Sequence, residues 1–151
     1  MRRLKAWVPA AVWMGVIFVM SAMPGDVSGE QSGTLMRLLM SVLSFVLGKE
    51  AATGISPDLI HLLIRKGAHM TEYAVLFFLN RRALKIEGAR RPGLLALVLC
   101  ALYAATDEFH QGFVAGRGPS VVDVGIDTLG AGIAWGVQCL FEQVHRRRNV
   151  T

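Results

Sequence analysis

Long apolar stretches, separated by shorter polar ones, divide the chain into candidate membrane spans. The first runs without a charge from Ala6 to Met23 and ends at Pro24. Later apolar stretches lie at 74–79, 94–105 and 121–140, and reach the length of a span only if charged residues are included. A helix that crosses a bilayer needs about 20 residues. The pattern predicts an all-α integral membrane bundle of four transmembrane helices in one domain, residues 1–151, with spans at about 6–23, 61–80, 93–112 and 121–141.

The first apolar stretch has two interpretations. Three basic residues precede it and the small residues Ser21 and Ala22 end it, as in a secretory signal peptide. The apolar part is long, however, and Met23 followed by Pro24 makes a poor processing junction. We therefore expect a retained transmembrane helix, with Ser21 as a simple cap at its end.

A further apolar segment, at about 34–48, lies between the first two predicted spans. It contains Arg37, Ser41 and Ser44 and is short for a span. An amphipathic helix of this kind can lie in the membrane surface. We expect an interfacial helix here, and a fifth span is the alternative.

The composition supports a membrane protein. The chain is 53% hydrophobic and 18% charged, with a mean hydropathy of +0.45, whereas average chains carry about 25% charged residues. This balance argues against a disordered chain, a coiled coil or a secreted disulfide scaffold. The two cysteines, Cys100 and Cys139, lie in apolar stretches and resemble buried small side chains rather than a redox or zinc motif.

The positive charge is concentrated in three segments. The net charge is +5, and 11 of the 16 lysines and arginines lie at the N-terminus, in the loop 81–91 and in the tail 145–151. Because cytoplasmic loops are enriched in basic residues, this distribution predicts a multi-pass protein of the plasma or inner membrane with both termini in the cytoplasm. It also explains the basic balance without a nucleic-acid partner.

With this topology, the charged residues within the spans fall at one level, near the outer face. Their spacings of three and four residues place them on common helix faces. A carboxylate at the centre of a membrane helix costs about 2.5–3.5 kcal/mol, so these side chains should face one another in a pocket. The catalytic candidates are Glu72, Asp107, Glu108 and His110. The ligand-binding candidates are Arg65, Lys66, His69, Tyr73, Gln111, Arg117, Asp123 and Asp127.

The carboxylates of this set outnumber its lysines and arginines. A divalent metal ion, protonated carboxyls or protonated histidines would each balance the excess, and oxygen-rich ligand sets suit magnesium, calcium or manganese. The cofactor is therefore left open. The candidate metal ligands are His69, Glu72, Asp107, His110 and Asp127.

Several of these residues form recognisable motifs. His69, Glu72 and Tyr73 follow the pattern H-x-x-E-Y, residues 107–111 read D-E-F-H-Q, Gly116 and Arg117 follow, and residues 123–130 have the pattern D-x-x-x-D-T-x-G. From about Trp7 to Gly132 the chain resembles the VanZ-like membrane protein family. The resemblance implies a small multi-helix membrane protein. The family's namesake is an accessory glycopeptide-resistance protein linked to lowered teicoplanin susceptibility, and the resemblance names a family better than a reaction.

Four functions remain open on these residues. An enzyme would be an acid–base or metal-assisted hydrolase or transferase at the outer leaflet, with Glu108 or Glu72 as base and His110 or His69 as acid. A binding protein would hold a polyprenyl-phosphate-linked precursor or a lipoglycopeptide. The others are a proton-coupled carrier and a structural network that only locks the helices. Gly132 and Gly136 form a G-x-x-x-G pair, which indicates a homodimer as one option.

Overall fold

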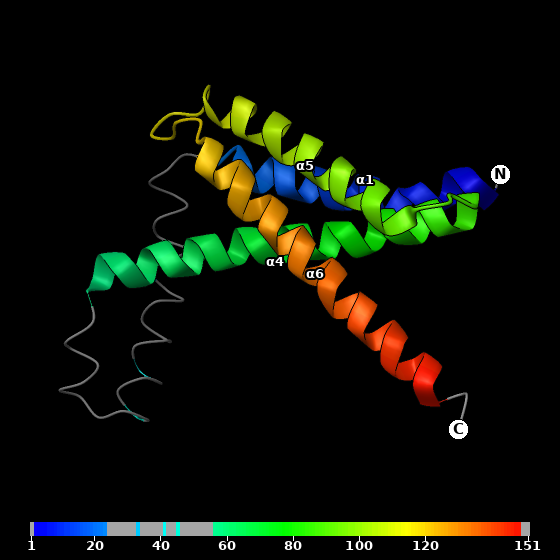
Figure 1. Ribbon diagram of the computed structural model, residues 1–151. Helices are drawn as coiled ribbons and strands as arrows, with labels where there is room; N and C mark the ends of the chain where they lie inside the picture. The colour runs from blue at the N-terminus through cyan, green and yellow to red at the C-terminus, as the bar shows by residue number, and fades with distance from the viewer. Residues whose placement is uncertain (1, 24–32, 34–40, 42–44, 46–55, 149–151) are drawn as a thin grey trace.

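The computed structural model describes residues 2–23, 33, 41, 45 and 56–148, and helices are the only regular secondary structure among these residues (Figure 1). An all-α fold is thereby confirmed. The predicted interfacial segment 34–48 lies outside the described residues, apart from Ser41 and Phe45, and stays a prediction. The four long helices are α1 (Arg2–Ser21), α4 (Pro57–Glu87), α5 (Pro92–Gln111) and α6 (Val121–Arg148).

Three of these helices are long and apolar enough to cross a membrane. They contain the segments Arg3–Ser21, Pro92–Gln111 and Val121–Arg148. The helix α4 is not among them, because Arg65, Lys66 and Glu72 interrupt its apolar stretch. A fourth span therefore stays a prediction. Lys66 and Glu72 are partly buried and belong to the site described below, whereas Arg65 is exposed.

Large apolar side chains cover the outside of the bundle. Val12 is 62% exposed, Leu102 61%, Phe109 70% and Leu140 62%. Water-soluble monomers rarely expose apolar surface on this scale, whereas a lipid environment accommodates it. The exposed apolar surface and the apolar helices together indicate a membrane protein.

Local sequence signals explain where the helices end. Gly88 follows α4 with a φ of 84°, and its N–H donates to the carbonyl oxygens of Leu84 and Lys85. This left-handed conformation is strained for side chains with a Cβ and favours glycine. Pro92 begins α5 at a position where a missing N–H costs nothing. The connection between α4 and α5 is consequently short, and the two helices run in opposite directions (Figure 1).

The helix α4 lies at the centre of the bundle and packs against α1, α5 and α6. Its buried residues Tyr73, Leu76 and Phe77 form the core with Ile17 of α1 and Cys100 of α5, among others. Figure 1 shows α6 crossing α4 and then diverging from α5. The direction of α6 brings its first half into the bundle and leaves its last turns away from it.

At Gly130 the helix α6 lies directly against the backbone of α4. A Cβ added there would lie 2.7 Å from the Cα of Met70 and 2.9 Å from its carbonyl carbon. Since real Cβ atoms do not approach a backbone so closely, the crossing requires glycine. Small residues allow such close helix contact in membrane bundles. Gly130 thus sets the distance between the polar faces of α4 and α6.

Contacts between helices define two ends of the bundle. At one end the Trp7 indole donates to Glu87 at 2.7 Å, and Arg81 pairs with Glu142 at 2.6 Å. The end of α4 therefore contacts both the start of α1 and the later part of α6, and we call this the basic end. At the other end Ser21 of α1 contacts Asp107 of α5.

Candidate functional site

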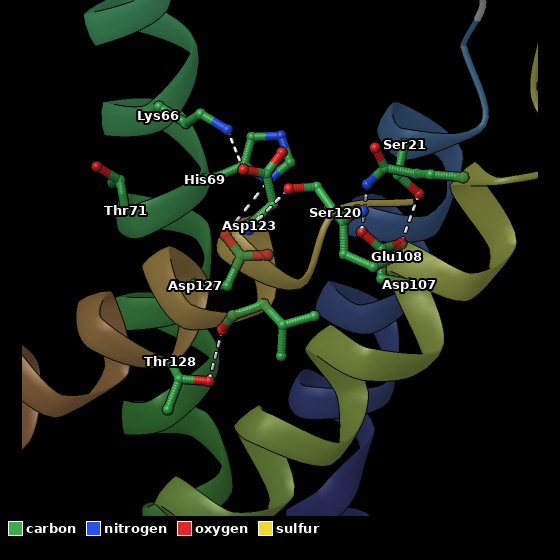
Figure 2. A network of polar contacts seen from close by, with 12 residues as sticks. Ser21, Lys66, His69, Thr71, Asp107, Glu108, Ser120, Asp123, Asp127 and Thr128 are labelled. Atoms are coloured by element: carbon green, nitrogen blue, oxygen red, sulfur yellow. Dashed lines mark hydrogen bonds and ion pairs between the residues drawn. The ribbon is translucent and has the colours of Figure 1, made fainter. Parts of the chain in front are cut away.

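The candidate site lies at the end of the bundle opposite the basic end, where four helices and one loop bring polar side chains together (Figure 2). We call this set the polar cluster. It consists of Ser21, Lys66, His69, Glu72, Tyr73, Asp107, Glu108, His110, Gln111, Arg117, Ser120, Asp123 and Asp127.

Asp107 is a buried junction between α1 and α5. Its Oδ1 accepts a hydrogen bond from Ser21 Oγ at 2.6 Å, and its Oδ2 accepts one from Gln111 Nε2 at 3.0 Å. All three side chains are buried. Ser21 is thus more than a cap, because its hydroxyl reaches the neighbouring helix. With a donor on each oxygen, Asp107 is arranged to hold the helix ends in place.

Arg117 reaches from the loop 112–120 back over this junction. Its Nη1 donates to the carbonyl oxygen of Ser21 at 3.2 Å and to Oε1 of Gln111 at 3.4 Å. Burial lowers the pKa of the Arg117 guanidinium, and the neighbouring carboxylates oppose that shift. Because a guanidinium stays protonated in proteins, Arg117 keeps a positive charge beside the cluster.

Glu108 joins α5 to the start of α6. Its Oε2 accepts a hydrogen bond from the backbone N–H of Ser120 at 2.9 Å, and Ser120 Oγ accepts one from the N–H of Asp123 at 3.3 Å. Both bonds satisfy N–H groups at a helix N-terminus, where negative charge is also favourable. Oε1 of Glu108 is buried and has no hydrogen-bond partner in the described chain. One carboxylate oxygen of Glu108 therefore connects α5 to the start of α6, and the other accepts no hydrogen bond from the described chain.

Two charged pairs connect α4 to α6. Lys66 pairs with Asp123, and His69 Nδ1 lies 3.3 Å from Oδ1 of Asp127 (Figure 2). Asp127 is fully buried. The His69–Asp127 contact has the distance of an ion pair without the geometry of a hydrogen bond, so both carboxylate oxygens of Asp127 lack a hydrogen-bond donor among the described residues.

Glu72 and Tyr73 lie on α4 between these groups. The Glu72 carboxylate experiences the charges of His69, Asp127 and Asp107. Its backbone carbonyl accepts a hydrogen bond from Trp13 Nε1 at 2.9 Å, which fixes α1 against α4. Tyr73 is fully buried, and its hydroxyl has no partner in the described chain. The Tyr73 hydroxyl is therefore a hydrogen-bonding group near the carboxylates that has no partner among the described residues.

The structure does not bring all predicted residues equally close. The His110 ring packs against Phe18, with ring centroids 4.4 Å apart, and its Nδ1 has no hydrogen-bond partner in the described chain. Arg65 is exposed on α4, at the edge of the set, and acts on His69 and Arg117 through its charge. His110 is thus a member of the cluster outside its hydrogen-bond network, and Arg65 lies at the edge of the cluster.

Ser120 is a member of the cluster that the sequence analysis did not select. The signal was available, because Ser120 precedes the last apolar stretch and an acid follows three residues later. That spacing is close to the capping-box pattern of a helix N-terminus. The role of Ser120 as donor to Glu108 depends on the packing of α5 against α6 and has no local signal.

The side chains, as placed, do not form a metal centre. Among the described residues, no group of three or more His, Cys, Asp or Glu side chains comes close enough to hold a metal ion. Four of the five candidate ligands are engaged in separate contacts: His69 pairs with Asp127, Asp107 bonds to Ser21 and Gln111, and His110 packs against Phe18. We therefore derive no chemistry through a metal.

Unpartnered polar atoms are concentrated in the polar cluster. The described chain has eight buried side-chain nitrogen or oxygen atoms without a hydrogen-bond partner, and seven belong to the cluster. Leaving a buried polar group unpaired costs about 1–3 kcal/mol, so native proteins rarely group them. The atoms are His69 Nδ1, Tyr73 OH, Glu108 Oε1, His110 Nδ1, Arg117 Nε, and Oδ1 and Oδ2 of Asp127.

Comparison with known proteins identifies the family of the chain. No curated protein and no solved structure matches the chain significantly. The sequence model of the VanZ/LLP1 family matches residues 6–142, which include every residue of the polar cluster. By this match over most of its length, the chain belongs to the VanZ/LLP1 family.

Proposed function

We propose that the polar cluster binds the head of an amphiphilic or lipid-linked envelope ligand at the outer face of the cell membrane. The observation that carries this proposal is the group of seven buried polar atoms without a hydrogen-bond partner, of which only His69 Nδ1 and Asp127 Oδ1 pair with each other as charges. A ligand that bonds to them would remove an energetic cost that the folded protein otherwise bears. Lipid-facing helices surround the cluster, so an amphiphile would reach it with its apolar part in the membrane.

The orientation rests on the basic end. The Trp7–Glu87 and Arg81–Glu142 contacts bring the basic segments of the chain to one end of the bundle. Basic segments favour the cytoplasmic side, which would place both termini inside. The polar cluster, at the opposite end, would then face the outer leaflet.

The unpartnered atoms indicate the chemistry of the ligand. Three of them are carboxylate oxygens, one on Glu108 and two on Asp127, and these accept hydrogen bonds. Arg117 Nε is a hydrogen-bond donor, and the guanidinium to which it belongs is positively charged. A matching head would offer several hydroxyl or amine donors and one anionic group. A polyprenyl-phosphate-linked sugar precursor has both, and the sugars and amines of a lipoglycopeptide such as teicoplanin supply the donors.

An enzyme at the same site is the second candidate. Oε1 of Glu108 is a buried carboxylate oxygen without a partner, which suits a general base toward a bound hydroxyl or water. His69, beside Asp127, would be the acid. A covalent nucleophile is not part of this proposal, because the cluster's two serine hydroxyls are used in contacts to Phe18, Asp107 and Asp123. Binding needs fewer assumptions than turnover and is our first choice.

A purely structural cluster is the third candidate, and the Asp107 junction favours it. Asp107, Ser21, Gln111 and Arg117 bond to one another and join α1, α5 and the following loop. The unpartnered atoms of Glu108 and Asp127 are not explained by such a lock. We therefore assign a structural role to the Asp107 junction and a binding role to Glu108 and Asp127.

The test uses Glu108→Gln in a teicoplanin-sensitive Gram-positive host. The amide oxygen can still accept from the Ser120 N–H, so the variant retains the α5–α6 contact and loses the charge at Oε1. Glu87→Gln is the matched control, because Glu87 is an exposed glutamate at the basic end. Wild type, both variants and an empty vector are compared at equal membrane levels by minimum inhibitory concentration.

We expect the wild type and Glu87→Gln to protect and Glu108→Gln to lose protection. Protection that survives Glu108→Gln would contradict the role of this carboxylate. If the wild type gives no protection, teicoplanin is not the ligand, and binding of radiolabelled lipid-linked precursor to the purified protein replaces the growth assay. Failure of both assays would favour the structural cluster.

A further inference from the structure

A second site lies at the basic end, and we propose that it binds the phosphate headgroup of an anionic phospholipid from the surrounding membrane. It is a groove of about 1140 Å³ between the C-terminal part of α4, the start of α5 and the C-terminal half of α6. Figure 1 shows that α6 diverges from α5 toward the end of α6 that lines this groove. The proposal is independent of the polar cluster and of the membrane orientation.

Positive charge lines one part of the groove. Arg81 and Lys85 come from α4, Arg91 precedes α5 and Arg146 belongs to α6. Glu142 is the only acid among the lining residues, and it pairs with Arg81 at 2.6 Å and Lys85 at 3.4 Å. Four cations against one carboxylate leave an excess that suits a phosphate. Arginine also binds phosphate through two N–H groups at once.

Apolar side chains line the rest of the groove. Phe78, Leu94 and Phe141 are 43%, 40% and 71% exposed. Trp135 lies directly on Gly93, where an added Cβ would come within 2.6 Å of the indole Nε1. The close packing holds the indole ring against the α5 backbone, as part of the groove wall. Cations beside aromatic and aliphatic surface match a molecule with a charged head and an acyl chain.

Two further features favour a phospholipid over a small soluble anion. The groove is larger than the roughly 300–1,000 Å³ of pockets for drug-sized ligands. Gln138 also lines it, and its Oε1 is buried without a hydrogen-bond partner in the described chain. A glycerol hydroxyl of a headgroup would donate to that oxygen. Basic pockets between membrane helices bind anionic headgroups in the same way, and phosphatidylglycerol combines the phosphate with the hydroxyls.

Trp135 allows binding to be measured in the full chain. The chain has three tryptophans, so Trp7→Phe/Trp13→Phe leaves the groove indole as the only one. The protein is reconstituted in phosphatidylcholine vesicles that contain either phosphatidylglycerol or phosphatidylcholine with brominated acyl chains at equal mole fraction. Bromine quenches a nearby indole. We expect brominated phosphatidylglycerol to quench Trp135 at a lower mole fraction than brominated phosphatidylcholine.

A matched pair of double variants separates the groove from general surface charge. Arg91→Gln/Arg146→Gln removes two exposed cations that line the groove, and Arg82→Gln/Arg147→Gln removes two exposed cations of the same end that do not. A cation near an anionic lipid contributes about a fivefold factor in affinity. By this estimate we expect the lipid preference measured at Trp135 to fall tenfold or more in the first variant and clearly less in the second, whose cations do not line the groove.

Three outcomes would overturn the proposal. Equal losses in both double variants would assign the preference to surface charge alone. Equal quenching by the two lipids would mean that the groove has no headgroup site. No quenching by either lipid, with a dimer by light scattering, would mean that a second copy covers the groove. Native mass spectrometry of the wild-type chain, which should retain phosphatidylglycerol, decides the matter if the tryptophan variants fail to fold.

Discussion

Ser21 Oγ donates a hydrogen bond to Asp107 Oδ1 at 2.6 Å, and this buried bond joins the C-terminal ends of α1 and α5. We expect Ser21→Ala to destabilise the protein by about 1–3 kcal/mol, because one oxygen of a buried carboxylate loses its donor. Reversible unfolding by SDS, followed by circular dichroism, measures the difference.

Thr106→Ala is the control for that experiment, because the exposed Thr106 hydroxyl donates to the carbonyl of Tyr103 in its own helix. Its loss should change the free energy of unfolding by about 0.5 kcal/mol or less. Equal effects of the two substitutions would show that the bond between α1 and α5 adds nothing to stability.

Gly130→Ala should disturb the crossing of α4 and α6. The added methyl group meets the Met70 backbone, which cannot move as a side chain can. Overpacking of this kind costs about 1–3 kcal/mol. Gly132→Ala adds the same methyl group where nothing in the described chain lies within 4 Å, so it should leave stability unchanged or raise it slightly. The same SDS titration compares them, and a larger loss in Gly132→Ala would contradict the close crossing.

Asp127→Asn and His69→Gln test the buried pair between α4 and α6. If this pair binds the ligand, each substitution should weaken ligand binding by about tenfold or more, which corresponds to roughly 1.4 kcal/mol, and should lower protection in the growth assay. The double variant should be little worse than either single one, because residues in direct contact act non-additively. Thr128→Val, next to Asp127 but bonded within its own helix to Val124, is the control. Fully additive losses would argue against a shared role.

The proposed topology is tested with single cysteines and an impermeant thiol reagent. Gly88 and Gly116 have positive φ, so a cysteine there would be strained, and the exposed neighbours Ala115 and Arg90 are better positions. In a Cys139→Ser background, Ala115→Cys should react from outside the cell and Arg90→Cys only after permeabilisation. The reverse pattern would place the polar cluster at the cytoplasmic face. Cys100 is buried and should stay unlabelled.

The sequence by itself determined the helical class and predicted most of the polar residues that the structure brings together at one end of the bundle. Helix geometry is local, so spacings of three and four residues place His69 with Glu72, and Asp123 with Asp127, on common faces. The cost of charge in an apolar helix then predicts that these faces turn inward. The motifs from His69 to Gly130 were sufficient to identify the family that the comparison confirms.

Only the tertiary structure decided which polar groups meet. Asp107 and Glu108 are adjacent in the chain, yet one joins α1 through Ser21 and the other caps α6 at Ser120. The sequence likewise predicted neither the close contact of Gly130 with Met70 nor the groove between Arg91 and Arg146. The spacing of residues along a helix decides which side of that helix each side chain faces. The angle and distance between two axes depend on how their side chains pack, and that information is spread over residues far apart in the chain.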